Sequence, residues 1–266
     1  MNNDELSPIH LDAYRPAEIA RRVEQFGVSK TQEPLTKILA LSVMAGAFIS
    51  YGAMLFTLVI SDSQLGAGPT QWLGGMAFSL GLILIVVGGA ELFTGNNLIV
   101  MAWASRKITT QEVLTNWVIV FFGNLIGALA TAFLVAASGV LGAPDTTLAG
   151  TAITMAENKV TTDFGQLFIR GLLCNVMVCL AVWLSMAAHT VAGKIIAIIF
   201  PISAFVALGF EHSIANMYII PLGIFLGSEL VTWKGVFANL LPVMLGNLFG
   251  GAGLVALVYW ACYLKE

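Results

Sequence analysis

Two short polar segments place ionisable side chains in the middle of long apolar stretches. The first carries Glu91, and the second carries Glu211 and His212. A carboxylate accepts hydrogen bonds and pairs with cations, whereas an imidazole gains or loses a proton near neutral pH. Ionisable groups at such positions mark the paths of ions and protons. His212 is therefore the leading functional residue that the sequence offers.

The two polar segments are copies of one motif. Residues 89–96 and residues 209–216 both fit the pattern G-x-E-x4-N, and the second copy follows the first after 120 residues. A second motif, GNLxG, occupies residues 123–127 and returns 123 residues later at 246–250. Because both motifs recur in the same order at nearly the same spacing, we expect two structurally related halves.

Common catalytic and metal-binding patterns are absent from the sequence. No GxxxxGK[ST], GxSxG or HExxH motif occurs, so neither ATP hydrolysis nor hydrolase chemistry has support. A single histidine without a second ligand is a poor metal site. The cysteines all lie inside apolar runs and indicate no disulfide framework: Cys174, Cys179 and Cys262. We predict a protein that is not an enzyme and that uses no metal or other cofactor.

The composition indicates which elements must position these residues. Of 266 residues, 58% are apolar and only 27 (12 Lys and Arg plus 15 Asp and Glu) carry a charge. An ordinary soluble domain has about 25% charged residues. So little charge excludes a soluble enzyme of the usual kind, a nucleic-acid-binding protein and a disordered chain. The chain is predicted to be a polytopic membrane protein whose partners include the lipid bilayer and no nucleic acid.

Six apolar stretches are long enough to cross a bilayer, which takes roughly 20 residues of helix. Each contains at most one charged residue, and they cover residues 38–60, 72–104, 113–141, 164–188, 195–227 and 236–264. Their length and their richness in Leu, Ala, Gly and Met exclude the short alternating strands of a β-barrel. The predicted fold class is an all-α integral membrane protein with six transmembrane helices.

The G-x-E-x4-N motifs predict that the second and fifth spans are broken. We expect helix 72–90, an irregular loop and half-helix 96–104 in the second span, and helix 194–208 and half-helix 214–227 in the fifth. Irregular backbone at membrane depth is tolerated only where it is buried in protein or lines a cavity. Glu91 and Glu211 are expected to accept hydrogen bonds from free amide groups and so anchor these loops.

Each half then contains three spans, and because three is odd the halves must lie in the membrane with opposite orientations. We place the inverted repeats at about 37–141 and 163–264, within one channel domain covering 37–266. Such an arrangement puts a transport site at the midplane, between the repeats. The glycines of the two GNLxG motifs are expected to let neighbouring helices approach closely.

Residues 1–36 are predicted to be a cytoplasmic amphipathic segment, with a helix at 17–28 that begins after Pro16. Basic residues set the orientation. Nine lie on the side of the termini and three on the other side: Arg15, Arg21, Arg22, Lys30, Lys37, Arg106, Lys107, Lys194 and Lys265 against Lys159, Arg170 and Lys234. Both termini are therefore predicted to be cytoplasmic, in a bacterial inner membrane.

Four segments closely resemble the formate/nitrite transporter family, above all its formate-channel branch. They are FSLGLILIVVGGAELFTGNN (78–97), LLCNVMVCLAVW (172–183), FVALGFEHSIANM (205–217) and GNLFGGAGLVALVYW (246–260). The resemblance extends from about Pro16 to Leu264. It implies an aquaporin-like fold and a homopentamer with one pore in each protomer. One departure is Gly95-Asn96-Asn97, which replaces a continuation rich in Ser and Thr.

The resemblance also implies roles for individual residues. His212 matches the central pore histidine, with Thr94 in the opposing loop, and Asn175 and Asn247 match amides that bond to the histidine or to the permeant ion. Lys159 matches a basic residue of the vestibule. The remaining matches are apolar residues that narrow the pore: Phe78, Leu82, Leu92, Phe93 and Phe205. Residues 1–36 are implied to form a pH-sensitive gate.

The predicted function is passage of formate and similar small weak-acid anions. His212 could attract the anion as an imidazolium, or donate a proton so that a neutral acid crosses the next apolar ring. The alternatives within the family are a nitrite or a hydrosulfide channel. A proton-coupled carrier would also use His212, whereas a water or neutral-solute channel would need no titratable pore residue.

Overall fold

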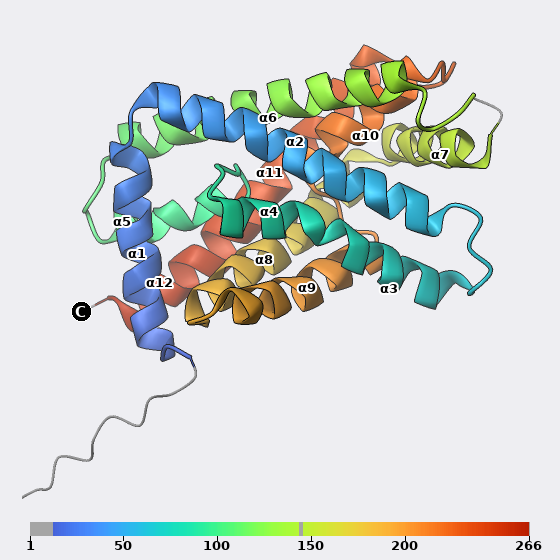
Figure 1. The fold of residues 1–266 in the computed structure, drawn as a ribbon. Helices are drawn as coiled ribbons and strands as arrows, with labels where there is room; N and C mark the ends of the chain where they lie inside the picture. Colours follow the sequence, from blue (N-terminus) through green and yellow to red (C-terminus); the bar gives the residue numbers. More distant parts are fainter. Residues whose placement is uncertain (1–12, 144–145, 266) are drawn as a thin grey trace, which may run out of the picture.

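Long apolar helices form the body of the protein (Figure 1). The structure is a computed structural model that describes residues 13–143 and 146–265. Within those residues there is no β-strand, and the one isolated β-bridge joins Ala13 to Ala188. The predicted all-α fold class is confirmed.

Five helical segments are long and apolar enough to cross a membrane. They correspond to the first, third, fourth and sixth predicted spans and to the first part of the second. In chain order they are α2 (Leu35–Ile60), α3 and α4 (Ala67–Phe78 and Leu80–Gly88), α6 (Thr110–Ser138), α8 (Phe164–Ala187), and α11, η2 and α12 (Trp233–Leu248, Phe249–Leu257 and Val258–Tyr263). The η2 segment is a π-helix within the last of these.

Both predicted breaks occur, and each follows a glycine with a left-handed backbone. Helix α4 ends at Gly89 (φ +83°), after which the chain runs without helix to η1 (Gly95–Ile99) and α5 (Val100–Ala104). Helix α9 (Val191–Ala207) is followed by Gly209 (φ +70°), and α10 (Ser213–Phe225) begins four residues later. Glycine adopts positive φ without a steric penalty, so it can end a helix within the apolar layer.

Two amphipathic helices lie at opposite ends of the helix bundle in Figure 1. Helix α1 (Pro16–Gln32) is longer than the predicted 17–28 and crosses the ends of the long helices. The first part of the predicted N-terminal segment, residues 1–12, lies outside the described residues. Helix α7 (Thr147–Thr161) was not predicted. No element was predicted between the third and fourth spans, where it lies.

The glycines of the GNLxG motifs sit where helices touch. A Cβ atom on Gly127 of α6 would overlap the carbonyl group of Val43 on α2, and one on Gly250 would overlap that of Leu172 on α8. These are backbone atoms that cannot move aside as a side-chain tip can. The predicted packing role is confirmed, and it places each motif's asparagine against the neighbouring helix.

Candidate pore site at the two helix breaks

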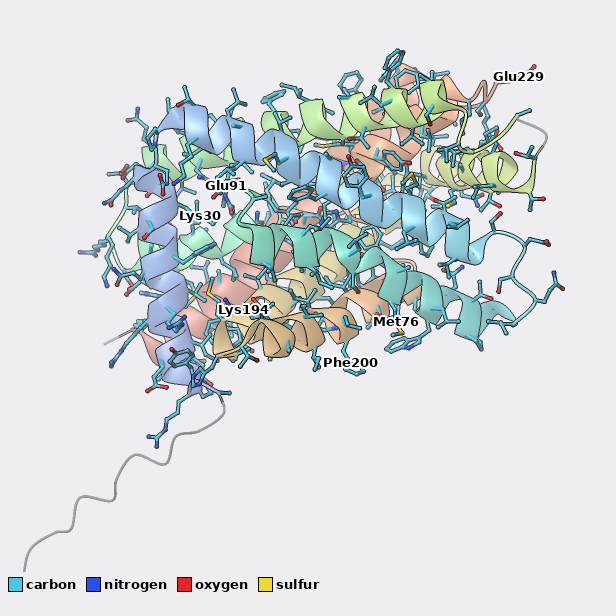
Figure 2. The ribbon with its side chains drawn as sticks, in the orientation of Figure 1. Lys30, Met76, Glu91, Lys194, Phe200 and Glu229 are labelled. Atoms are coloured by element: carbon cyan, nitrogen blue, oxygen red, sulfur yellow. The ribbon has the colours of Figure 1, made fainter. Side chains whose placement is uncertain are left out.

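The first break is anchored by its buried glutamate. Glu91 accepts a hydrogen bond from Asn96 Nδ2 (2.7 Å) and forms an ion pair with Lys30 of α1. Figure 2 shows Lys30 and Glu91 next to each other where α1 meets the bundle. Asn96 Nδ2 also donates to Asn116 Oδ1 of α6 (3.0 Å). Both charged side chains are nearly inaccessible, at 10% and 9% exposure.

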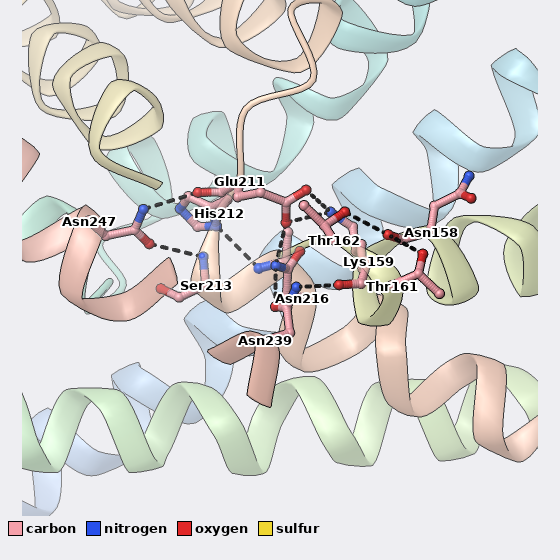
Figure 3. Close-up of polar contacts among 11 residues, drawn as sticks. Asn158, Lys159, Thr161, Thr162, Glu211, His212, Ser213, Asn216, Asn239 and Asn247 are labelled. Atoms are coloured by element: carbon pink, nitrogen blue, oxygen red, sulfur yellow. Dashed lines mark hydrogen bonds and ion pairs between the residues drawn. The ribbon is translucent and has the colours of Figure 1, made fainter. Parts of the chain in front are cut away.

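The second break repeats this arrangement (Figure 3). Glu211 accepts from Asn216 Nδ2 (2.6 Å) and from Lys159 Nζ of α7 (3.0 and 2.9 Å to its two oxygens). Asn216 Nδ2 also donates to Asn239 Oδ1 of α11 (2.8 Å). Again both members of the ion pair are largely buried, with side-chain exposures of 16% and 7%.

The glutamates thus differ in part from their predicted environment. Each accepts from an amide, as expected, but the amide is the side chain of the motif's own asparagine, and the second partner is a lysine. A buried carboxylate needs an opposite charge because desolvation penalises it strongly. Burial in turn lowers the pKa of the Lys30 ammonium, while the Glu91 carboxylate opposes that shift.

The asparagines of the GNLxG motifs hold the backbone of both breaks. Asn124 accepts from the Phe93 backbone N–H (2.9 Å) and donates to the carbonyls of Ser42 (2.7 Å) and Glu91 (2.8 Å). It is completely buried, so all these groups would otherwise lack partners. One amide therefore ties the first break to the neighbouring helix α2.

Asn247 makes the equivalent bonds at the second break. It accepts from the Ser213 N–H (3.0 Å) and donates to the carbonyls of Gly171 (2.7 Å) and Glu211 (3.0 Å). Its predicted bond to His212 is not among them, because both of its amide hydrogens reach backbone carbonyls. Contact between Asn247 and a permeant ion stays a prediction.

Asn175 also bonds to other partners than the predicted histidine. Its Nδ2 reaches the Thr94 carbonyl (3.3 Å), Asn97 Oδ1 (3.3 Å) and the Asn247 carbonyl (2.7 Å). The amide lies on α8 and is completely buried. Asn175 thereby links the backbone of the first break to that of helix α11.

His212 and Thr94 face each other, as the resemblance implied. His212 Nε2 lies 3.0 Å from Thr94 Oγ1, and both side chains are buried. His212 is also the N-cap residue of α10, where its Nδ1 accepts from the Ala215 backbone N–H (3.1 Å). Because Nδ1 accepts a hydrogen bond, the neutral imidazole carries its hydrogen on Nε2 and donates it to Thr94.

Each helix break borders a cavity. One of 730 Å³ is lined by Leu82 and Leu92 together with Lys30 and Glu91. The other, of 310 Å³, is lined by residues from the second break and by two phenylalanines: Phe78, Lys159, Phe205, Glu211 and His212. Basic and apolar side chains thus line both cavities.

Four of the five apolar residues predicted to narrow the pore line one of the two cavities. Phe78 and Phe205 form an edge-to-face pair with ring centroids 5.7 Å apart, and the Phe205 ring stacks near His212 at 6.1 Å. Leu82 and Leu92 border the other cavity. Phe93 packs its ring on Phe121 (5.1 Å) and lines neither of these two cavities, so its predicted place at a narrowing is not observed.

Three residues of these hydrogen-bond networks were not predicted from the sequence. They are Lys30 of α1, and Asn116 and Asn239, which accept from the asparagines of the two G-x-E-x4-N motifs. A signal for the asparagines was present: Asn116 precedes Asn124 by eight residues, just as Asn239 precedes Asn247. Lys30 carried no comparable signal. In the described residues, no group of three His, Cys, Asp or Glu side chains is placed to hold a metal ion.

A family model described as formate/nitrite transporter matches residues 17–261. The chain belongs to this family. It is 43% identical to an uncharacterized transporter, YrhG, of Bacillus subtilis (95% of this chain, 94% of the relative). It is 38% identical to the formate channel FocA of Escherichia coli (96% of each). A solved structure titled a pentameric formate channel with formate bound superposes with a TM-score of 0.80 at 36% identity, covering 87% of this chain and 98% of the other.

These comparisons confirm the family that the sequence resembles and support the observed fold. Together with the five apolar helical segments, they establish a membrane protein of the formate/nitrite transporter family. They concern the class of the protein. The roles of His212, Thr94 and their neighbours in a pore stay predictions.

Proposed function

We propose that this chain forms a pore for formate and similar small monovalent weak-acid anions. The observation that carries the proposal is the contact between His212 and Thr94, because His212 lines a cavity together with a lysine and two phenylalanines. The similarity to proteins named formate channels supports formate as substrate. The chain then acts in transport and catalyses no reaction.

The physical problem in such a pore is the cost of moving a charge past apolar side chains, about 3 kcal/mol on lenient membrane-insertion scales. Thr94 lowers this cost in our proposal. Its Oγ1 accepts the hydrogen of His212 Nε2, so its own hydroxyl hydrogen stays free to donate to an anion oxygen. His212 therefore orients the donor even while it is neutral.

Proton exchange at His212 would be coupled to the arriving anion. An imidazolium carries hydrogen on both nitrogens, so protonation removes the acceptor that now bonds to Ala215 N–H. A nearby negative charge offsets this loss by favouring the imidazolium. Transfer of the proton to the anion then produces a neutral acid, which passes the phenylalanines or leucines at lower cost.

The remaining expectations from the sequence form part of the same proposal. The chain would cross a bacterial inner membrane six times, with both termini in the cytoplasm, and would assemble as a homopentamer. The solved relative with a pentameric title supports the assembly. Residues 1–36 would influence opening, since α1 supplies Lys30 to the first break and its cavity.

An anion-flux assay in liposomes tests the proposal. Purified protein would be reconstituted and the fluxes of formate, nitrite, hydrosulfide and chloride compared at several pH values. We expect formate flux to exceed chloride flux, because chloride cannot accept a proton at these pH values. Nitrite or hydrosulfide flux above that of formate would change the substrate assignment, and water permeability without any anion flux would overturn the proposal.

A further inference from the structure

The two breaks correspond position by position, and the bonds around them define the correspondence. The Glu91 N–H donates to the carbonyl of Leu41 on α2 (3.3 Å), and the Glu211 N–H donates to that of Arg170 on α8 (3.2 Å). Position 41 thus matches 170, an offset of 129, while 91 matches 211, an offset of 120. Any position where the matched residues differ in chemistry marks a departure from the shared scaffold.

The departures cluster around Thr94. Thr94 corresponds to Ile214 and Asn97 to Met217, at the offset of 120. On the neighbouring helices, with the offset of 129, Asn175 corresponds to Gly46 and Cys179 to Ser50. Four of these residues form one buried cluster at the first break: Thr94, Asn97, Asn175 and Cys179. Ser50, the counterpart of Cys179, instead donates to the Gly46 carbonyl of its own helix (2.8 Å).

Within this cluster, two consecutive backbone carbonyls are held by side chains. The Thr94 carbonyl accepts from Asn175 Nδ2 (3.3 Å) and from the Cys179 thiol (3.5 Å). The Phe93 carbonyl accepts from Asn97 Nδ2 (2.7 Å), and Asn97 Oδ1 in turn accepts from Asn175. Asn97, Asn175 and Cys179 are completely buried, so these bonds do not compete with bulk water.

The π-helix η2 makes room for the cluster at Gly251. A Cβ atom there would overlap Asn175 Nδ2 and lie only 2.8 Å from Cys179 Sγ and 2.9 Å from Asn97 Cβ. The corresponding residue of the other half, at the GNLxG offset of 123, is Ala128. A π-helical turn is rare and is frequently found at functional sites, which fits a segment shaped to admit these side chains.

We propose that Asn97, Asn175 and Cys179 are positioning residues that hold the Thr94 hydroxyl against His212, and that Gly251 leaves the space they need. The inference rests on the proposed function, in which Thr94 donates to the anion. It explains why only the first break carries the cluster: its counterpart at position 214 is an isoleucine, which has no donor to orient.

Gly251→Ala tests the proposal because the added methyl group displaces both donors to the Thr94 carbonyl without touching Thr94 itself. Gly253→Ala is the matched control, since a Cβ atom there meets nothing within 4 Å in the same π-helix. We expect Gly251→Ala to lower formate flux about tenfold, as a misplaced reactive group does, and to flatten its dependence on pH. Gly253→Ala should retain wild-type flux.

A second variant keeps the test decisive if Gly251→Ala does not assemble. Cys179→Ala removes one donor without a clash, and we expect a severalfold lower flux with a flattened pH profile. Ser50→Ala, at the matched position, should leave both unchanged. Adding Thr94→Ala to Cys179→Ala should cause no greater loss than Thr94→Ala alone, because Cys179 acts through Thr94.

The outcomes separate this inference from the proposed function. Wild-type flux and pH profile in both Gly251→Ala and Cys179→Ala would overturn the positioning role while leaving the pore intact. Independent, multiplicative losses from Cys179→Ala and Thr94→Ala would do the same. Absence of anion flux through the wild-type protein would instead refute the proposed function, and the positioning role with it.

Discussion

At corresponding positions after their glutamates, the first helix break carries Leu92 and the second carries His212. The bonds that anchor the two breaks are alike. Each glutamate accepts from a lysine of an amphipathic helix and from the asparagine five residues on, and each break is held by the asparagine of a GNLxG motif. The scaffold is thus duplicated, while the functional chemistry resides in the side chains that were not duplicated.

The amphipathic helices extend this correspondence beyond the predicted repeats. Lys30 and Lys159 are 129 residues apart, the same offset that relates α2 to α8. Helix α1 is therefore the counterpart of α7, and each supplies one lysine to the break of its own half. We infer that each repeat begins with its amphipathic helix, ahead of the predicted starts at about 37 and 163.

The largest expected effect comes from breaking one ion pair. Lys159→Met leaves Glu211 buried without its cation, and removing one partner of a buried pair costs about 3 to 5 kcal/mol. We expect a large drop in the thermal unfolding temperature of the purified protein. Adding Glu211→Gln should restore most of the loss, because a neutral amide needs no counter-ion. A double variant as unstable as Lys159→Met would contradict the charge argument.

The same experiment on the first break sharpens the comparison. Lys30→Met should destabilise the protein and Glu91→Gln should rescue it, since the pair is equally buried. If Lys30→Met proved harmless, α1 would not be part of the duplicated scaffold. Unfolding in denaturant, followed by tryptophan fluorescence, provides the measurement.

A smaller and equal effect is expected from the two GNLxG asparagines. Asn124→Leu and Asn247→Leu each remove bonds to one backbone N–H and two carbonyls. Buried groups left without partners cost about 1 to 3 kcal/mol. Both variants should therefore lower stability by similar amounts in chemical denaturation. A clear loss in only one of them would show that the two breaks are not held alike.

The smallest expected effect separates the structural role of His212 from its role in the pore. His212→Ala removes the N-cap acceptor of α10, a loss of about 1 kcal/mol. His212→Asn supplies another N-cap acceptor and should recover that stability, yet it has no imidazole and should not recover pH-dependent formate flux. Full recovery of flux by asparagine would assign His212 a structural role alone.

Much of this architecture could be predicted from residue patterns. The G-x-E-x4-N motif located both breaks because a carboxylate and an amide cannot stand in an apolar run without an irregular backbone and partners. Helix α7 escaped prediction because its 15 residues include Glu157 and Lys159 and form no apolar stretch long enough to span a bilayer, whereas its contacts with α10 are tertiary. The sequence also indicates that Asn175 and Asn247 are polar and buried, but not which group each amide reaches.

The sequence likewise does not show which side chains of the first break face a cavity. Phe93 and Leu92 are adjacent in the sequence, yet one packs on Phe121 and the other borders a cavity. Only the backbone direction within the break decides between these environments. The lysine of α1 was likewise hidden, because 61 residues separate Lys30 from Glu91 and no motif joins them.

In the proposed pore, His212 has no counterpart in the first break, and it both orients the Thr94 donor and exchanges a proton with the anion. His212→Leu makes the second break resemble the first and removes both of these functions, so formate flux through this variant is measured against pH in liposomes. His189→Leu is the control, because this histidine packs on Tyr14 outside both cavities. We predict that His212→Leu assembles normally but loses pH-dependent flux, whereas His189→Leu retains it. Unchanged, pH-dependent formate flux through His212→Leu would contradict the role of His212 in the pore.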